Sequence, residues 1–403
     1  MTQVGSAERA SYAQAIGTGV ATPPLRVPLS DLALDDELLA AVQETIASGW
    51  WSMGPIVDEF EQAFARFCDV PHAIAVSSGT AALHLALLAC GCGPGDEVIL
   101  PSLNFVAAAN TVVHTGAEPV FCDIRSARDL NLDPADLKAA VGPRTRAIVA
   151  LHYGGFCCDM RAVTAIADYM GLPIIEDAAH APGASWRGRM CGTIGRVGRF
   201  SFFSNKNLPI GEGGMVVTHD SELAERMRLL RSHGMTTLTW DRHRGHAHSY
   251  DVVAPGYNYR LDEVRAAVGL VQLGRLLGGN AARAQVVDTY RRLLDGVDGV
   301  TVAFGDRTDD ASHHLAVVVL PEGVERERVQ EFMRQRGIQT SVHYPPIHRF
   351  SAYAGSVGAR TLPVTEAVAD RVLTLPLYPH LEEGQVEAVA TALLDALAVY
   401  HDI

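Results

Sequence analysis

Apolar and polar segments alternate in a regular way between about residue 69 and residue 217. Short β-rich runs such as HAIAVSS, DEVILP and EPVFCDI are each followed by a helix-length segment, as in TAALHLALLACG, FVAAANTVVHTG and DPADLKAAV. The order continues with TRAIVALHY, MRAVTAIADYMG and LPIIEDAA. Near-continuous apolar strands separated by helices are typical of a parallel sheet that is covered on both faces. The pattern therefore predicts an α/β domain.

Local signals at the ends of the predicted helices agree with this pattern. Asp133 is placed to cap a helix that begins at Pro134, and Gly171 follows AIADYM where a C-terminal glycine is expected. Farther along, FSFF and GMVVTHD are strand-like, and we expect helices over about residues 221–233 and 262–277. The segment DRHRGHAHSYDVVAPGYNYR between those helices is polar and is predicted to be a loop.

The order of elements changes after about residue 278. There a helix is followed by the strand-like runs VTVAF and HLAVVVLP, a further helix, and a closing helix near residues 387–400. A chain of 403 residues also exceeds the size at which one hydrophobic core stops growing. We therefore predict an N-terminal tail over residues 1–30, a large α/β domain over residues 31–277 and a smaller α+β domain over residues 278–403.

Composition narrows the possible functions. Hydrophobic residues make up 48% of the chain and its formal net charge is −13, which favours a well-packed globular protein and disfavours binding to nucleic acid or to an anionic membrane. The N-terminus lacks the basic start and apolar core of a secretory signal, and no apolar run approaches the roughly 18 residues of a membrane span. Seven cysteines form no CxxC pair. We expect reduced, mostly buried thiols in a cytoplasmic protein that acts on small molecules.

Two of the predicted strands end in residues suited to ligand binding. In AVSSGTAALHLAL a helix begins directly after an apolar strand, so the free N–H groups of the helix end can bind an anion together with Gly79 and Thr80. The alternative is a simple helix cap. In LPIIEDAAHAPGA a buried strand places Glu176 and Asp177 at its carboxyl end, with His180 nearby. A carboxylate there can pair with a cationic nitrogen of a ligand, and the alternative is a capped turn.

A single lysine follows a third strand-like run. Lys206 lies in GRFSFFSNKNLPIGEGG between FSFF, which contains Ser201, and a glycine-rich turn. A lone lysine is ordinarily a surface residue, but in a crevice a lysine acts as a Schiff-base nucleophile when burial or nearby positive charge lowers its pKa. An anion cradle, a carboxylate and an amine are the three partners that pyridoxal 5′-phosphate (PLP) requires.

The same residues fall in motifs of a known family. The motifs VSSGTAALHLAL, PVFCDI, IIEDAAHAPGA, FSFFSNK with GEGG, and GYNYRLDEVRAAVGLVQL occur in this order, and the similarity extends from GWWSMGPIVDEFEQAFARF to SVHYPPIH. The chain resembles the sugar aminotransferases of the DegT/StrS type, which are fold-type I PLP enzymes. The resemblance implies an α/β fold, with a large domain whose mostly parallel sheet is flanked by helices and a smaller α+β C-terminal domain.

The resemblance also implies roles for individual residues. Lys206 would form the Schiff base with PLP and later carry the proton between two carbon positions, while Asp177 would keep the pyridine nitrogen protonated and His180 falls near the ring hydroxyl. The other implied cofactor-binding residues are Gly79, Thr80 and Ser201 at the phosphate, Phe105 stacked on the ring, and Asn258, which a neighbouring subunit contributes to the phosphate. A homodimer with shared active sites is therefore expected.

Other candidate residues concern the substrate or a metal. His343, Tyr344 and His348 lie in VHYPPIH, which the resemblance places near the acceptor pocket, although His343 can equally be a structural, hydrogen-bonded residue. Trp51 in GWWSMGP falls at the mouth of that pocket, and the ordinary role of adjacent tryptophans is packing. Three histidines of the polar loop lack the spacing of a metal site, so no metal is expected: His243, His246 and His248.

These observations favour a PLP-dependent aminotransferase. It would move an amino group from glutamate or glutamine to a keto-sugar, for which a nucleotide-linked 4-keto-6-deoxyhexose is the first candidate. A keto-cyclitol is an alternative acceptor, and a PLP-dependent sugar dehydratase and a non-catalytic PLP-binding regulator are alternative functions. Some family members that dehydrate or deoxygenate carry histidine where this chain has Lys206. Departures from the common family pattern at Pro182 and in SNK leave the identity of the sugar open.

Overall fold

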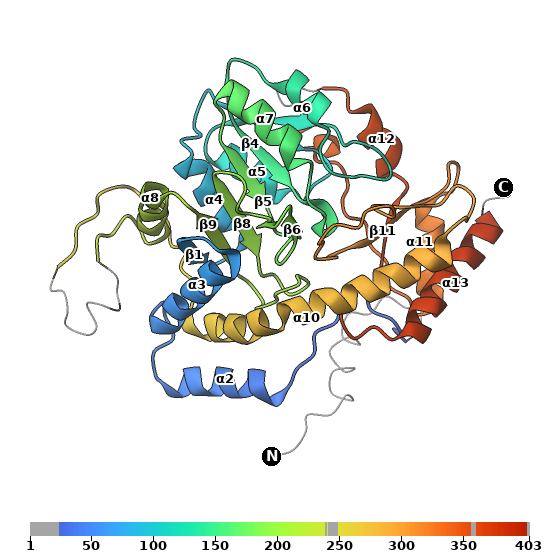
Figure 1. The fold of residues 1–403 in the computed structure, drawn as a ribbon, viewed down its shortest axis with the longest axis horizontal. Helices are drawn as coiled ribbons and strands as arrows, with labels where there is room; N and C mark the ends of the chain where they lie inside the picture. The colour runs from blue at the N-terminus through green and yellow to red at the C-terminus, as the bar shows by residue number, and fades with distance from the viewer. Residues whose placement is uncertain (1–23, 238–239, 241–248, 356–359, 401–403) are drawn as a thin grey trace.

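A seven-stranded sheet forms the centre of the molecule (Figure 1). The computed structural model describes residues 24–237, 240, 249–355 and 360–400. The strand order is β1-β9-β8-β5-β4-β2-β3. In chain order the strands of this sheet are β1 (His72–Val76), β2 (Glu97–Pro101), β3 (Glu118–Cys122), β4 (Thr145–Leu151), β5 (Ile174–Asp177), β8 (Val197–Ser201) and β9 (Gly214–Thr218).

The sheet is mostly parallel, as the alternation of apolar strands and helices predicts. Neighbouring strands from β8 through β5, β4 and β2 to β3 run parallel, whereas β9 is antiparallel to both β8 and β1. Residues 202–213, which join β8 to β9, contain no helix that would carry the chain back across the sheet. A short connection of this kind permits only antiparallel pairing. The strand β9 is therefore the exception within the predicted parallel sheet.

Helices bury both faces of this sheet. They are α3 (Pro55–Cys68), α4 (Gly79–Ala89), α5 (Ala107–His114), α6 (Pro134–Ala140), α7 (Met160–Met170) and α8 (Ser221–Arg231). Successive residues of one strand enter opposite cores: Ala73 and Ala75 of β1 pack in the core that contains Phe64, while Ile74 and Val76 pack in the core with the leucines of α4. A strand alternates its side chains between two faces, so apolar residues at every position require two cores.

A smaller antiparallel sheet follows a long helix. The sheet has the order β10-β11-β12, formed by β10 (Thr301–Val302), β11 (Ala316–Val319) and β12 (Val372–Leu375), and it packs with α11 (Arg326–Gln335) and α13 (Glu383–Tyr400). Of these strands, β12 was not predicted, and α13 begins four residues earlier than predicted. The short helix α12 (Pro363–Ala369) and the hairpin of β6 (Ser185–Trp186) with β7 (Arg189–Met190) were also not predicted.

The helix expected to end near residue 277 continues without a break. The single helix α10 (Glu263–Leu294) spans 32 residues and packs against α3, α13 and α2 (Asp36–Ala47). The glycines at positions 278 and 279 resemble a helix stop, but packing along the whole helix outweighs their low helix propensity. The expected domain boundary at residues 277 and 278 falls inside this helix, and the division into domains stays a prediction.

Several local predictions are confirmed. The Asp133 carboxylate accepts a hydrogen bond from the N–H of Ala135 at the start of α6, and Gly171 ends α7 with a positive φ of 66°. All seven cysteines are free and buried.

Residues 1–23 of the predicted tail lie outside the described residues, and Val27 forms a β-bridge with Ile338. Among the described helices, none is long and apolar enough to cross a membrane.

The first residue of α10 anchors the beginning of α3. The buried Glu263 carboxylate accepts hydrogen bonds from the N–H groups of Gly54 (2.9 Å), Ile56 (3.0 Å) and Val57 (2.9 Å). The residue that precedes α3, Gly54, has no side chain to cap the helix, so a carboxylate from a distant segment replaces the usual cap and interacts with the positive helix end.

Replacing Glu263 by Ala should therefore lower the free energy of unfolding. We expect a loss of about 2–4 kcal/mol, because three N–H groups lose a charged acceptor together. Urea unfolding followed by circular dichroism measures the change. The exposed Glu387 provides the control, since Glu387→Ala should alter stability by no more than about 0.5 kcal/mol. Equal effects of the two substitutions would contradict the proposed cap.

Candidate active site

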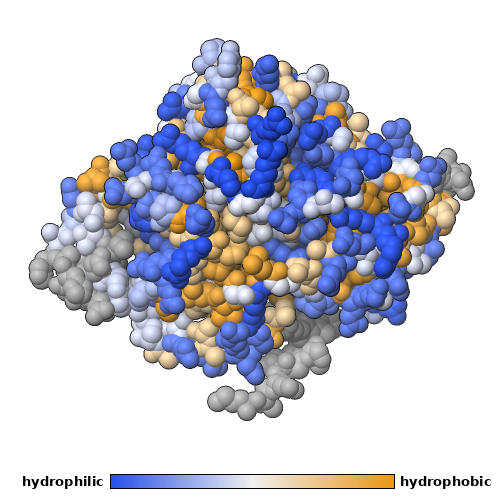
Figure 2. Space-filling model, viewed as in Figure 1, coloured by the Kyte–Doolittle hydropathy of each residue, from blue (hydrophilic) through white to orange (hydrophobic). Residues whose placement is uncertain are grey.

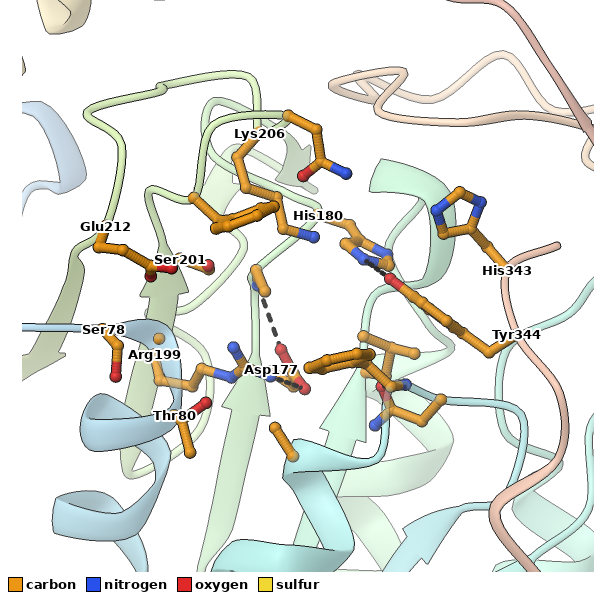
Figure 3. A pocket seen from close by; sticks show the side chains of 18 residues that line it. Ser78, Thr80, Asp177, His180, Arg199, Ser201, Lys206, Glu212, His343 and Tyr344 are labelled. Carbon is orange, nitrogen blue, oxygen red and sulfur yellow. Dashed lines mark hydrogen bonds and ion pairs between the residues drawn. The ribbon is translucent and has the colours of Figure 1, made fainter. Parts of the chain in front are cut away.

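A cavity of about 320 Å³ opens at the carboxyl ends of the central strands (Figure 3). It brings together most of the residues that the sequence singled out: Gly79, Thr80, Phe105, Asp177, His180, Ser201, Lys206, His343 and Tyr344. They come from segments far apart in the chain, which the parallel arrangement of β5 and β8 and the start of α4 place at one edge of the sheet. Ligands of open α/β sheets bind at this edge.

The start of α4 forms one wall of the cavity. Ser78 caps the helix, with its hydroxyl accepting a hydrogen bond of 3.1 Å from the N–H of Ala81. A Cβ atom at Gly79 would lie 2.7 Å from the Cβ of Ser201, so glycine is required for this close approach. The first N–H groups of a helix have no partner within it. The segment is therefore both a capped helix and a polar wall that can hold an anion.

The two adjacent carboxylates at the end of β5 point to different places. Asp177 lines the cavity, whereas Glu176 accepts hydrogen bonds from the N–H groups of Gly192 (2.8 Å) and Ile194 (2.5 Å) and contacts His152 Nε2 at 2.8 Å. Both residues are completely buried. Of the two, only Asp177 can meet a ligand in the cavity, because successive residues of a strand face opposite sides.

Glu176 belongs to a buried polar cluster outside the cavity. In this cluster, one imidazole nitrogen of His152 and the Sγ atoms of Cys157 and Cys191 lie within 4.8 Å of one another. His152 Nε2 is paired with Glu176, and Nδ1 accepts a hydrogen bond of 3.2 Å from the N–H of Cys158. Both ring nitrogens of this histidine are thus occupied by protein groups. The histidines considered earlier as metal ligands, His243, His246 and His248, lie outside the described residues.

The sequence analysis did not single out Arg199, which lies at the floor of the cavity. The guanidinium of this buried residue forms an ion pair with the Asp177 carboxylate, whose Oδ1 also accepts a hydrogen bond of 3.2 Å from the N–H of Ala179. Arg199 Nη1 lies 3.1 Å from the position of a Cβ built on Gly79. A charged residue inside the apolar run of β8 was the available signal, because a buried arginine requires a partner.

The Lys206 side chain is buried and points into the cavity, with its amine directed toward the cluster of aromatic residues (Figure 3). Its Nζ lies 3.3 Å from Nε2 of His314, a residue that the sequence analysis also missed. Burial, followed by the nearby charge of Arg199, lowers the pKa of this amine to about 7, although Asp177 opposes the shift. Near neutral pH a large fraction of the amine is therefore uncharged and nucleophilic.

An aromatic and imidazole cluster closes the opposite side of the cavity. His180 Nε2 lies 2.9 Å from the Tyr344 hydroxyl, and its Nδ1 accepts a hydrogen bond of 3.3 Å from the N–H of Gly154. Burial, with a further contribution from Lys206, holds the pKa of His180 well below its usual value. The exposed ring of Phe105 lies 5.9 Å from that of Tyr344, between centroids. His343 Nδ1 contacts the Thr374 hydroxyl at 2.9 Å, so this residue lines the cavity and is hydrogen-bonded as well.

Three expected site residues do not line the cavity of their own chain. Trp51 is 57% exposed, and its indole N–H donates to the carbonyl of Ile46. His348 Nδ1 contacts the Ser102 hydroxyl at 2.7 Å. Asn258 is exposed and forms a β-bridge with Ser232. The roles expected for these residues stay predictions.

Comparison with known proteins decides the family. The model of the DegT/DnrJ/EryC1/StrS aminotransferase family matches residues 33–394. The chain belongs to this family. The resemblance found in the sequence motifs is thereby confirmed, and so is the predicted fold class. As a member of the DegT family the protein is a sugar aminotransferase.

Similar proteins include one curated relative and several solved structures. The spore coat polysaccharide biosynthesis protein SpsC of Bacillus subtilis is 42% identical over 378 residues, which cover 92% of this chain and 96% of SpsC. The structure of S. venezuelae DesV is 39% identical, with a TM-score of 0.85, and the match covers 93% of this chain and 98% of DesV. A putative sugar aminotransferase from Streptococcus pneumoniae in its PLP form is 26% identical, with a TM-score of 0.86 and 94% and 99% of the two chains covered.

DegT-family aminotransferases depend on PLP, and the residues of this cavity fit that cofactor. The close approach of Gly79 to Ser201 leaves a polar cradle at the end of α4 that any larger side chain would fill. Asp177 supplies a carboxylate and Lys206 a nucleophilic amine within the same cavity. The cavity therefore contains a suitable protein group for each of the phosphate, the pyridine nitrogen and the aldehyde of PLP.

Replacement of Arg199 tests the electrostatics of this DegT-family site. Arg199→Met removes a positive charge that disfavours the Lys206 ammonium and frees the Asp177 carboxylate, so the pKa of Lys206 should rise from about 7 and less neutral amine should be present at neutral pH. Acetylation of Lys206 in the cofactor-free protein, followed across pH by peptide mass spectrometry, measures this pKa.

Two control variants accompany that experiment. Arg199→Lys keeps the positive charge and should leave the pKa of Lys206 closer to its value in the unmodified protein. Arg161→Met, an exposed substitution on α7, should have no effect on it. Thermal melting checks that the Arg199→Met protein is folded, since breaking a buried ion pair costs about 3–5 kcal/mol. A pKa that falls or stays constant in that folded variant would refute the assignment.

Proposed function

We propose that this DegT-family protein is a PLP-dependent aminotransferase that transfers an amino group from glutamate or glutamine to a nucleotide-linked 4-keto-6-deoxyhexose. The observation that carries the proposal is the buried amine of Lys206 in one cavity with the Asp177 carboxylate and the start of α4. The PLP form reported for the similar Streptococcus pneumoniae protein supports the cofactor. The name of SpsC, a polysaccharide biosynthesis protein, supports a sugar substrate.

Some residues of the cavity would bind the cofactor, and Lys206 would transfer the proton. When bound, PLP supplies an electron sink for the carbon from which a proton is removed. Asp177 would hold a proton at the pyridine nitrogen, and Arg199 is the buried ion-pair partner of the Asp177 carboxylate. The first turn of α4 and the Ser201 hydroxyl bind the phosphate. The neutral amine of Lys206 removes and returns the proton at the reacting carbon.

The opposite wall of the cavity would bind the ring and the acceptor. Phe105 and His180 line the cavity, where Phe105 would cover the cofactor ring and exclude water, and His180 would hydrogen-bond the ring hydroxyl. His343 and Tyr344 supply polar groups within reach of sugar hydroxyls. Because Lys206 occupies the position where histidine would favour dehydration, transamination is preferred over the dehydratase alternative. A proton-transferring lysine likewise favours an enzyme over a PLP-binding regulator, and a keto-cyclitol stays as the alternative acceptor.

The absorbance spectrum of the PLP-loaded protein tests the donor reaction. Glutamate or glutamine, added without an acceptor, should convert the yellow cofactor to colourless pyridoxamine phosphate. Lys206→Ala should abolish this conversion while PLP still binds without a covalent bond, and Lys138→Ala, at an exposed position on α6, should behave like the unmodified protein. Full transaminase activity in Lys206→Ala would overturn the mechanism.

Product analysis then separates the possible acceptors and reactions. An amino sugar formed from a nucleotide-linked keto-sugar supports the proposal, and an amino cyclitol supports the alternative acceptor. Loss of a hydroxyl group without gain of nitrogen would show dehydration. A protein that binds PLP but converts neither donor nor any keto-sugar would fit the regulator.

The proposal includes a homodimer in which Asn258 completes the phosphate site of the neighbouring subunit. Asn258 is exposed and absent from the cavity of its own chain, which leaves it available to a second copy. Apolar residues gather on the face that α10 crosses (Figure 2), and Leu277 of this helix is 58% exposed. Apolar surface of this kind is common where subunits associate.

Mixed dimers test whether the active sites are shared. Lys206→Ala and Asn258→Ala should each be inactive or strongly impaired alone. In a dimer of one copy of each, one site carries both defects and the other carries neither, so coexpression should restore about a quarter of the normal activity in a random mixture. If both residues act within one chain, mixing cannot create an intact site and activity stays low.

A further inference from the structure

The amine of Lys206 has a specific neighbour that the proposed mechanism does not use. His314 lies just before β11, and its Nε2 is 3.3 Å from Lys206 Nζ. Both side chains are buried. Among the described residues, no other hydrogen-bond partner is found for this amine. A buried amine with one partner takes its orientation from that partner.

The hydrogen-bond pattern behind His314 determines which ring nitrogen carries the proton. The side-chain NH₂ of Asn207 donates to Asn280 Oδ1 (2.8 Å) and to the carbonyl of Ser312 (2.7 Å). Its oxygen therefore faces His314 Nδ1, at 2.9 Å, and can only accept a hydrogen bond there. His314 must carry its proton on Nδ1, which leaves the lone pair of Nε2 directed at Lys206.

Asn280 connects this series of hydrogen bonds to the main chain. Its NH₂ group donates to the carbonyl of Pro182 at 2.9 Å, so its oxygen is the atom that faces Asn207. The series of hydrogen bonds that runs from Lys206 through His314 and Asn207 to Asn280 is thus complete at each step. It ends on main-chain carbonyls. Such a network holds each member in one orientation.

The charges around His314 keep it in the neutral form. Burial, with further contributions from Lys206 and His343, holds the pKa of His314 well below its usual value. The Arg199 guanidinium and the Asp177 carboxylate act on the amine through their charges, and they form an ion pair with each other. His314 therefore accepts a hydrogen bond from Lys206 and does not donate one.

We propose that His314 is a positioning residue, which holds the Lys206 amine by its Nε2 lone pair and aims it at the reacting atoms of the cofactor and substrate. This inference rests on the proposed function of Lys206. Asn207 and Asn280 act through His314, because they determine its tautomer.

His313, the adjacent residue, provides a matched control. It is also buried, but its ring packs on Phe156 at 5.2 Å between centroids, and no contact with Lys206 is found. Its Nδ1 has no hydrogen-bond partner among the described residues. A substitution at His313 changes packing in the same segment without changing the Lys206 contact.

The test compares two binding reactions of the cofactor-free protein. The first is covalent attachment of PLP to Lys206, trapped with borohydride and located by mass spectrometry, which needs a well-oriented amine. The second is binding of pyridoxamine phosphate, which has no aldehyde and needs only the cavity. His314→Leu and Asn207→Leu should each slow attachment about tenfold, the effect of one lost hydrogen bond, and leave pyridoxamine phosphate affinity within about twofold.

Further variants distinguish orientation from packing. His314→Gln, whose amide oxygen can accept a hydrogen bond, should restore part of the rate, and His313→Leu should attach PLP normally. The double variant of His314→Leu and Asn207→Leu should be no slower than either alone, because both act through one chain of hydrogen bonds. Normal attachment in His314→Leu, or an equal loss of pyridoxamine phosphate affinity, would overturn the inference.

The outcome also separates this inference from the proposed function. If the unmodified protein attaches PLP at Lys206 but aminates no sugar, the acceptor assignment fails while the role of His314 is still decided by the variants. If the unmodified protein does not attach PLP, the proposed function and the role of His314 both fail.

Discussion

The buried ion pair between Asp177 and Arg199 is the interaction on which the candidate site depends. The two residues face each other as Cα partners in the parallel pairing of β5 with β8, so the register of the sheet itself brings the charges together. Neither charge would be tolerated alone in this buried position. One guanidinium thus pairs with a carboxylate and lowers the pKa of the Lys206 amine in the same cavity.

The site joins the central sheet to the segment that leads into the smaller sheet. The large sheet carries Asp177 and Ser201, and α4 begins shortly after its strand β1. In the later part of the chain, His314 precedes β11 and Tyr344 follows α11. The Lys206 amine lies 3.3 Å from His314 Nε2 and is influenced by the charges of Arg199 and Asp177. Its chemistry therefore depends on how the large sheet packs against the later part of the chain. The continuous helix α10 links the two regions.

Much of the site could be predicted because its residues are local to recognisable strand ends. Gly79 and Lys206 follow strands and Asp177 ends one, and parallel strands bring such ends to one edge of a sheet. Glu176 and Asp177 could not be distinguished in the sequence, since adjacent carboxylates look alike until the strand orientation is known. In the structure Glu176 is held by main-chain N–H groups outside the cavity, and Asp177 faces into it.

The sequence by itself determined the α/β pattern, the mostly parallel sheet and the three chemical groups of the cavity, because strand and helix periodicity and short motifs are local properties. Only the tertiary structure revealed Arg199 as the partner of Asp177, the contact of His314 with Lys206, and the continuation of α10 through the glycines at positions 278 and 279. These features depend on contacts between residues far apart in the chain. Hydrogen bonds and packing formed across such distances override local propensity, and the sequence around a residue does not identify its distant partner.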